Sequence, residues 1–141
     1  MHKREKKFCV TSDDGLVKTV VAEMEDEYHH IVLTMGIESD QLRIARIDLD
    51  MIRHPEPTCK ACEENLRGLT GISVQHPRFR QKLLKVIGGE RGCFHVLELL
   101  YEIQDYTRSI FWDQRPDNKG HYEISKAGHK GTVRCIAFCK R

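Results

Sequence analysis

Long apolar runs are missing from this chain of 141 residues, and so is any strong net charge. No stretch approaches the ~18 consecutive apolar residues that a membrane-spanning helix requires. The basic start, residues 2–7, leads into no apolar segment of the kind found in secretory signals. The formal net charge of +2 is too small to indicate a nucleic acid partner. We therefore expect a cytoplasmic protein that binds neither membranes nor nucleic acids.

Internal repeats and low-complexity segments are also absent, and aromatic residues make up only 7% of the chain. Hydrophobic residues at 40% and charged residues at 31% are typical of a globular protein rather than a disordered one. The length favours one domain over residues 1–141. Within it we expect a sheet region at 8–52, a helical region at 58–114 and a tail at 115–141.

Alternating apolar and polar residues predict four strands in the first third of the chain. Asp14-Gly15 lies between two β-prone segments and predicts a tight hairpin turn. The alternation in residues 42–51 changes phase near Ala45, which indicates a β-bulge. The short connections favour an antiparallel meander. The predicted strands cover about 9–12, 16–24, 30–37 and 42–51.

Helical patterns follow the sheet region. Thr58 is expected to cap a first helix that is anchored by Leu66 and Leu69. Pro77 suits the first position of a second helix, and Gly88-Gly89 suits its end. The apolar positions of this second helix recur at helical spacing, and they are Phe79, Leu83, Leu84 and Ile87.

A third helix is predicted from about Gly92 to Phe111. Its apolar stripe comprises Val96, Leu99, Leu100, Ile103, Tyr106, Thr107 and Ile110. Residues 132–138 could add a strand in the tail. Together the elements predict an α+β fold, with an antiparallel meander of about four strands followed by about three helices.

Six cysteines stand out in a chain that we expect to face a reducing compartment. Cys59-x-x-Cys62 follows His54, and Cys93-x-His95 lies at the start of the third predicted helix. Thiols and imidazoles are the usual ligands of transition metals and the usual nucleophiles and bases near neutral pH. Metal binding, catalysis and simple burial are therefore better interpretations of these residues than disulfides.

The first functional hypothesis is a metal site that holds zinc or another divalent transition metal. Cys59, Cys93 and His95 would be its core ligands, and Cys62 or His54 would complete the set. Because residues two apart diverge by about 200° around a helix, Cys93 would have to lie at or before the helix start. Such a site could be structural or catalytic.

The second hypothesis is a small metal-independent catabolic enzyme. Cys93 would be the nucleophile, with His95 or His30 as its base and Arg91 as a contact for an anion. The helix start and Arg91 both favour a negatively charged sulfur.

A third hypothesis is a non-catalytic module that binds a small molecule or associates with itself through the sheet face. Asp48 and Asp50 share one face of a strand, where solvation explains them better than acid–base chemistry. The adjacent His29 and His30 point in opposite directions on a strand, so they are not expected to act as a ligand pair. No glycine-rich phosphate loop follows a strand.

Several motifs give the chain a resemblance to a bacterial family known only as domain of unknown function 2889. They extend over roughly residues 13–112, and the last of them is the most specific. Phe94 stands where that family usually has a small hydroxyl residue, and Cys62 is not one of its features. The resemblance implies a domain and a site region, but no reaction. The motifs are Asp14-Gly15-Leu16, His30-Ile31-x-Leu33, Arg53-x-Pro55-x-x-x-Cys59, Leu69-x-Gly71-Ile72 and Gly89-Glu90-Arg91-Gly92-Cys93-x-His95-x-x-Glu98-Leu99-Leu100.

Overall fold

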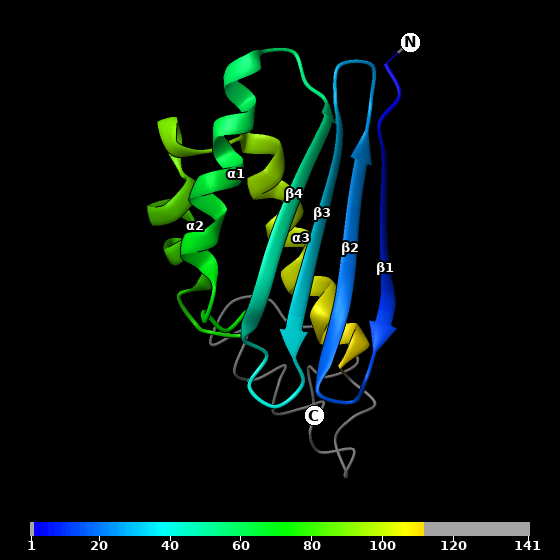
Figure 1. Cartoon of the computed structure of the whole chain (residues 1–141), viewed down its shortest axis with the longest axis vertical. Helices are drawn as coiled ribbons and strands as arrows, with labels where there is room; N and C mark the ends of the chain where they lie inside the picture. The colour runs from blue at the N-terminus through cyan, green and yellow to red at the C-terminus, as the bar shows by residue number, and fades with distance from the viewer. Residues whose placement is uncertain (1, 112–141) are drawn as a thin grey trace, which may run out of the picture.

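Four antiparallel strands form a single sheet in the computed structural model, which describes residues 2–111. Sequential strands are neighbours in this sheet, in the order β1-β2-β3-β4 (Figure 1). Three α-helices and short 3-10 segments follow them along the chain. The predicted α+β meander is therefore confirmed. The strands are β1 (Glu5–Asp13), β2 (Val17–Glu25), β3 (His30–Glu38) and β4 (Ile44–Arg53).

The predicted hairpin turn joins β1 to β2. The Asp13 side chain accepts a hydrogen bond from the Gly15 amide at 3.0 Å, and the Asp14 side chain accepts one from the Val17 amide at 2.8 Å. Gly15 has a φ of 87°, which a residue with a side chain rarely adopts. These contacts confirm the turn and explain why its sequence is rich in aspartate and glycine.

The change of phase near Ala45 corresponds to a real irregularity in the pairing of β3 with β4. Gly36 pairs with Arg46, but the next residue, Ile37, pairs with Ile44. Ala45 is thus the extra residue of a β-bulge, as the sequence predicts. The bulge restores the alternation, so that Ile44 and Ile47 both face the core.

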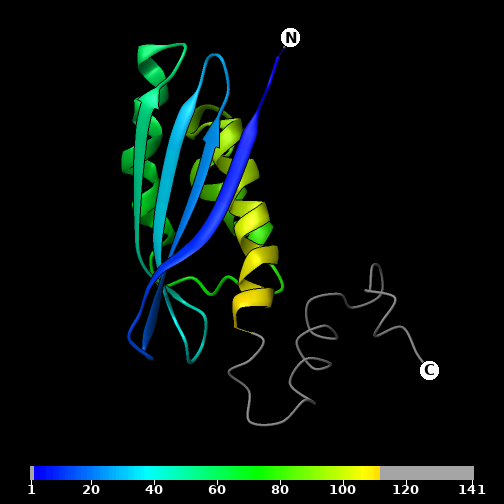
Figure 2. The ribbon, with the colours of Figure 1, turned by 90° about the vertical axis from the view of Figure 1, so that its right-hand side faces the viewer.

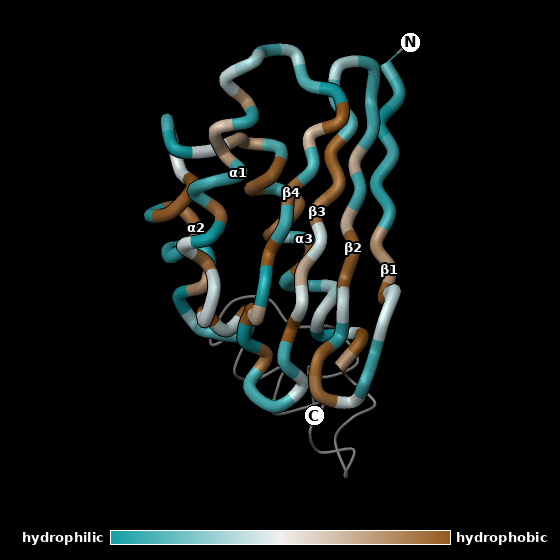
Figure 3. Tube along the Cα trace, in the orientation of Figure 1, coloured by the Kyte–Doolittle hydropathy of each residue, from teal (hydrophilic) through white to brown (hydrophobic). Residues whose placement is uncertain are grey.

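Only one face of the sheet carries the hydrophobic core. Along β2 and β3, buried and half-buried residues largely alternate, and Figure 3 shows hydrophobic stretches in both strands. Figure 2 shows α3 running along one side of the sheet. Asp48 and Asp50 are exposed on β4, which fits the solvated face that we expected. The buried residues of the two central strands are Lys18, Val20, Ala22, Met24, Ile31, Leu33, Met35, Gly36 and Ile37.

The first helical segment is less regular than predicted. It consists of a 3-10 turn (Pro57–Ala61), the four-residue α1 (Cys62–Asn65) and a second 3-10 turn (Leu66–Leu69). Thr58 does not cap it, because Glu56 holds the N-cap position and makes no side-chain cap bond. Leu66 and Leu69 are buried as expected.

The second and third helices complete the core. Helix α2 (Phe79–Ile87) begins two residues after Pro77, and a short 3-10 turn (Gly89–Arg91) leads to α3 (Phe94–Ile110). Leu84 departs from the predicted stripe, because its side chain is exposed on α2. Five of the seven residues that we predicted for the α3 stripe are buried, and Tyr106 and Ile110 are half-buried. No described helix is long and apolar enough to cross a membrane.

A buried lysine joins the first hairpin to the end of α3. Lys18 forms an ion pair with Asp13, and its ammonium group lies 5.4 Å from the centre of the Phe111 ring. Lys18 occupies a core-facing position of β2, so its charge needs both partners. The tail strand predicted at 132–138 lies outside the described residues.

Candidate functional site

The connection between α2 and α3 places Cys93 at the start of α3. Gly92 approaches the end of α2 so closely that a Cβ atom there would lie 2.2 Å from the Ile87 carbonyl oxygen. The Arg91 guanidinium donates to the Lys85 carbonyl at 2.6 Å, and the Arg91 carbonyl accepts from Asn65 at 2.6 Å. Arg91 therefore ties the helix ends together. Cys93 follows with an extended backbone as the N-cap residue of α3.

Three thiols from two separate segments line one hollow of about 210 Å³. Cys59 comes from the first 3-10 turn, Cys62 begins α1, and Cys93 precedes α3. Cys59 and Cys93 are half-buried, whereas Cys62 is only 2% exposed. The rest of the lining consists of Thr58, Ala61, Glu90 and Gly92. The sequence could identify these cysteines as candidate site residues, and the fold brings them together.

Cys62 and Cys93 are in direct contact. Burial raises the pKa of the Cys62 thiol, while a hydrogen bond from the Cys93 backbone N–H opposes that rise in pKa. The neighbouring Cys93 and Cys59 also favour the neutral form of Cys62. Cys62 is therefore protonated at neutral pH and is a poor first nucleophile.

The histidines that we proposed as partners of these thiols do not line the hollow. His54 is half-buried, and its Nδ1 lies 2.6 Å from the Glu56 carbonyl oxygen. His30 contacts Glu23 on the sheet, with 2.6 Å between Nε2 and the carboxylate oxygen. His95 packs against the ring of His29. Within residues 2–111, no group of three or more histidine, cysteine or acidic side chains is arranged to hold a metal ion, so we assign no metal ligand.

His95 and His29 form a second constellation at the same end of the fold. Their ring centres are 4.1 Å apart in an edge-to-face arrangement that joins α3 to the β2–β3 connection. Burial lowers the pKa of His95, and the nearby His29 and Arg4 lower it further. Glu98 and Asp26 oppose that shift without reversing it. The Nδ1 atom of His95 is buried and has no hydrogen-bond partner among the described residues.

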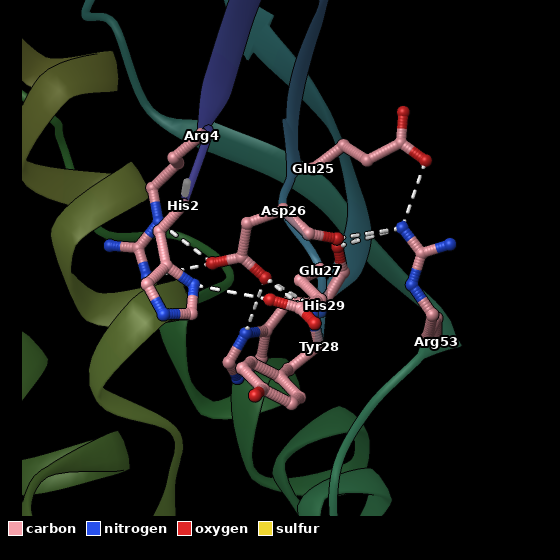
Figure 4. Close-up of polar contacts among 8 residues, drawn as sticks. All are labelled: His2, Arg4, Glu25, Asp26, Glu27, Tyr28, His29 and Arg53. Carbon is pink, nitrogen blue, oxygen red and sulfur yellow. Dashed lines mark hydrogen bonds and ion pairs between the residues drawn. The ribbon is translucent and has the colours of Figure 1, made fainter.

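Asp26 organises the β2–β3 connection around His29 (Figure 4). Its carboxylate accepts from the His29 amide at 2.7 Å and lies 2.9 Å from His29 Nδ1. Arg4 approaches the other carboxylate oxygen to 2.7 Å. Burial by itself would raise the pKa of Asp26, but the bonds from Arg4 and His29 hold it well below its usual range. Asp26 is thus a stable anion, and the facing His29 Nδ1 is a donor.

His29, Asp26 and Arg4 are the residues that our sequence analysis missed. A usable signal was present for His29, because the core positions of β3 are odd-numbered. Extending this alternation back by one step places His29 on the helix-covered side and His30 on the other. The contact with His95 needed the fold, since 66 positions separate the two residues.

We expect the stability of the protein in acid to depend on Asp26. Because its pKa is lowered on folding, its contribution is complete above its ordinary pKa and is lost as the pH falls below that value. Asp26→Asn should therefore be less stable near neutral pH. Urea midpoints should fall less for this variant than for the wild type between about pH 5 and pH 2.5. Parallel pH profiles would contradict this role of Asp26.

Comparison with known proteins gives a family and no activity. A family model described as Protein of unknown function (DUF2889) matches residues 9–109, a span that includes Cys59, Cys62, Cys93 and both site histidines. No curated protein and no solved structure matches the chain.

Proposed function

Because the chain belongs to the DUF2889 family, whose description carries no reaction, we propose from its own residues that it is a thiol–disulfide exchange protein. Cys93 is the attacking thiol and Cys62 the resolving thiol. The observation that supports this function is the contact between a half-buried Cys93 and a buried Cys62 in one small hollow. Pairs of an accessible and a buried thiol are typical of redox-active sites.

The surroundings of Cys93 suit the attacking role. Cys93 is half-buried and lines the hollow, and it is the N-cap residue of a helix of 17 residues, whose N-terminus carries a partial positive charge. Cys62 suits the second role, because its sulfur meets the backbone of Cys93 and its burial protects it from direct attack. The third thiol, Cys59, is close enough to compete for Cys62.

The exchange balances without a metal or a cofactor. The Cys93 thiolate attacks one sulfur of a small disulfide such as oxidised glutathione, and the other half leaves as a thiolate. Cys62 then loses its proton and attacks the Cys93 sulfur, which releases the second thiolate. The small disulfide gains two electrons and becomes two thiols, while Cys62 and Cys93 lose two electrons and become a disulfide.

Trapping the mixed disulfide tests the division of roles. We expect Cys62→Ser to accumulate glutathione on Cys93, because the resolving thiol is gone. The experiment uses full-length chain in which Cys9, Cys135 and Cys139 are serine, since these thiols lie outside the hollow or outside the described residues. Mass spectrometry of proteolytic peptides locates the adduct.

Cys59→Ser in the same background is the matched control. It removes a thiol from the hollow but leaves the proposed pair, so it should form the internal disulfide and hold little glutathione. Glutathione on Cys59 rather than Cys93 in the Cys62→Ser protein would reverse the assignment. Equal adduct formation in both variants would remove Cys62 from the resolving role.

Metal analysis separates this proposal from the zinc hypothesis. Protein purified without an affinity tag should contain far less than one equivalent of zinc and should show free thiols in the hollow. Stoichiometric zinc that blocks Cys59, Cys62 and Cys93 would favour the metal hypothesis instead. A cytoplasmic location, a small-molecule partner and a homo-oligomer remain predictions.

A further inference from the structure

The β2–β3 connection is firmly tied to the rest of the sheet. On one side, Arg4 from the chain before β1 pairs with Asp26. On the other, Arg53 at the end of β4 donates to the Asp26 carbonyl at 2.8 Å and to Glu25 at 3.0 Å. Figure 4 shows the two arginines approaching from opposite sides. The β2–β3 connection therefore holds His29 in a fixed position.

His95 on α3 is the residue that contacts His29. The ring contact with His29 joins the sheet to the first turn of the helix, one turn before the buried Leu99. Neutral imidazoles pack in this way without repulsion between charges, and ionised Asp26 already fixes which nitrogen of His29 donates. The two rings thus fit together when His95 carries no charge.

A charge on both rings would change this balance. Two imidazolium groups at 4.1 Å repel each other, and Arg4 lies on the same side. The buried Nδ1 of His95 would become an N–H donor, with no acceptor among the described residues. Two carboxylates oppose these effects, Glu98 from α3 and Asp26 from the connection, but Asp26 is already shared between Arg4 and His29.

We propose that the His29–His95 contact is a pH-dependent latch between the β2–β3 connection and the first turn of α3. The latch is closed while His95 is neutral and opens when both rings carry a proton. This inference is independent of thiol exchange, since it concerns the docking of the helix start rather than the chemistry of Cys93.

Amide hydrogen exchange in the full chain tests the latch. The Leu97 amide bonds to the Cys93 carbonyl at 3.0 Å and reports on the first turn of α3, while Leu33 in the centre of β3 reports on the sheet. Between about pH 7.5 and pH 5, the protection factor of Leu97 should fall relative to that of Leu33. The expected fall is about tenfold for each unit by which closing lowers the pKa of His95.

Two variants make the result specific. His95→Phe keeps an aromatic ring that cannot be protonated, so the relative protection of Leu97 should no longer depend on pH. His54→Gln replaces a half-buried histidine that is not part of the latch, and it should behave like the wild type. A pH-dependent fall that persists in His95→Phe, or wild-type Leu97 protection that follows Leu33 at every pH, would overturn the proposal.

Nuclear Overhauser effects between the two rings provide a second test that needs no variant. Cross-peaks between His29 and His95 ring protons should be present at neutral pH and should disappear once both rings have titrated. Cross-peaks that survive the complete titration would show that the contact persists with two charges, and the latch would be wrong.

Discussion

Leu100→Ala is expected to destabilise the protein by about 2–5 kcal/mol, the range for fully buried leucines whose removal leaves a cavity. Leu100 is 0% exposed at the middle of α3, where the helix packs on the sheet. The loss should appear as a lower urea midpoint with an unchanged slope. Structure at the thiol hollow should survive at low denaturant, because Leu100 lies almost two helical turns beyond Cys93.

Leu84→Ala is the matched control. It removes the same atoms from α2, but half of the Leu84 side chain is already exposed, with a relative accessibility of 50%. We expect its effect to stay below about 1 kcal/mol. Equal losses at the two positions would contradict the packing described for α3.

Gly92→Ala should have an effect of similar size, about 3 kcal/mol or more, for a different reason. The new Cβ atom would lie 2.2 Å from the Ile87 carbonyl oxygen and 2.7 Å from the Ile87 Cβ atom. The φ of Gly92 is −157°, which any residue can adopt, so the penalty is steric rather than conformational. Relief requires the α2–α3 connection to move, and Cys93 moves with it.

Gly68→Ala provides the comparison for Gly92→Ala. Its Cβ atom would meet a methyl group of Val86 at 3.1 Å, and a side chain can yield where a backbone carbonyl cannot. Thermal unfolding should therefore show a smaller loss for Gly68→Ala. If Gly92→Ala is as stable as the wild type and keeps the Cys62–Cys93 contact, the close approach of Gly92 to Ile87 is not needed to position Cys93.

The order and pairing of the strands could be predicted from the sequence because their signals are local, although β1 begins at Glu5, four residues before the predicted start. Alternation fixes which residues of a strand face the core, and Asp14-Gly15 fixes a turn. Even the bulge at Ala45 shows as a change of phase. The segment after β4 was harder, because tertiary contacts of Leu66 and Leu69 hold short 3-10 turns that no local pattern specifies.

The candidate site could be predicted only in part. Local spacing marked Cys59, Cys62 and Cys93, and the fold does gather them around one hollow. Spacing could not show that His95 turns toward His29, because that contact joins segments far apart in the chain. The metal hypothesis required Cys93 to lie at or before the start of the helix, and Cys93 is indeed the N-cap residue of α3. His95 nevertheless packs against His29 and does not line the hollow with the thiols.

The central claim is that Cys93 and Cys62 take part in thiol–disulfide exchange. Its most direct test is to map the disulfides of the full chain. Cys9, Cys135 and Cys139 are replaced by serine for this purpose, and no other residue is changed. After equilibration with a mixture of reduced and oxidised glutathione, peptide mass spectrometry should find a Cys62–Cys93 disulfide, which reverts to two thiols when the mixture is made more reducing. A map that shows only Cys59–Cys62, or no internal disulfide when all of the glutathione is oxidised, would contradict the account.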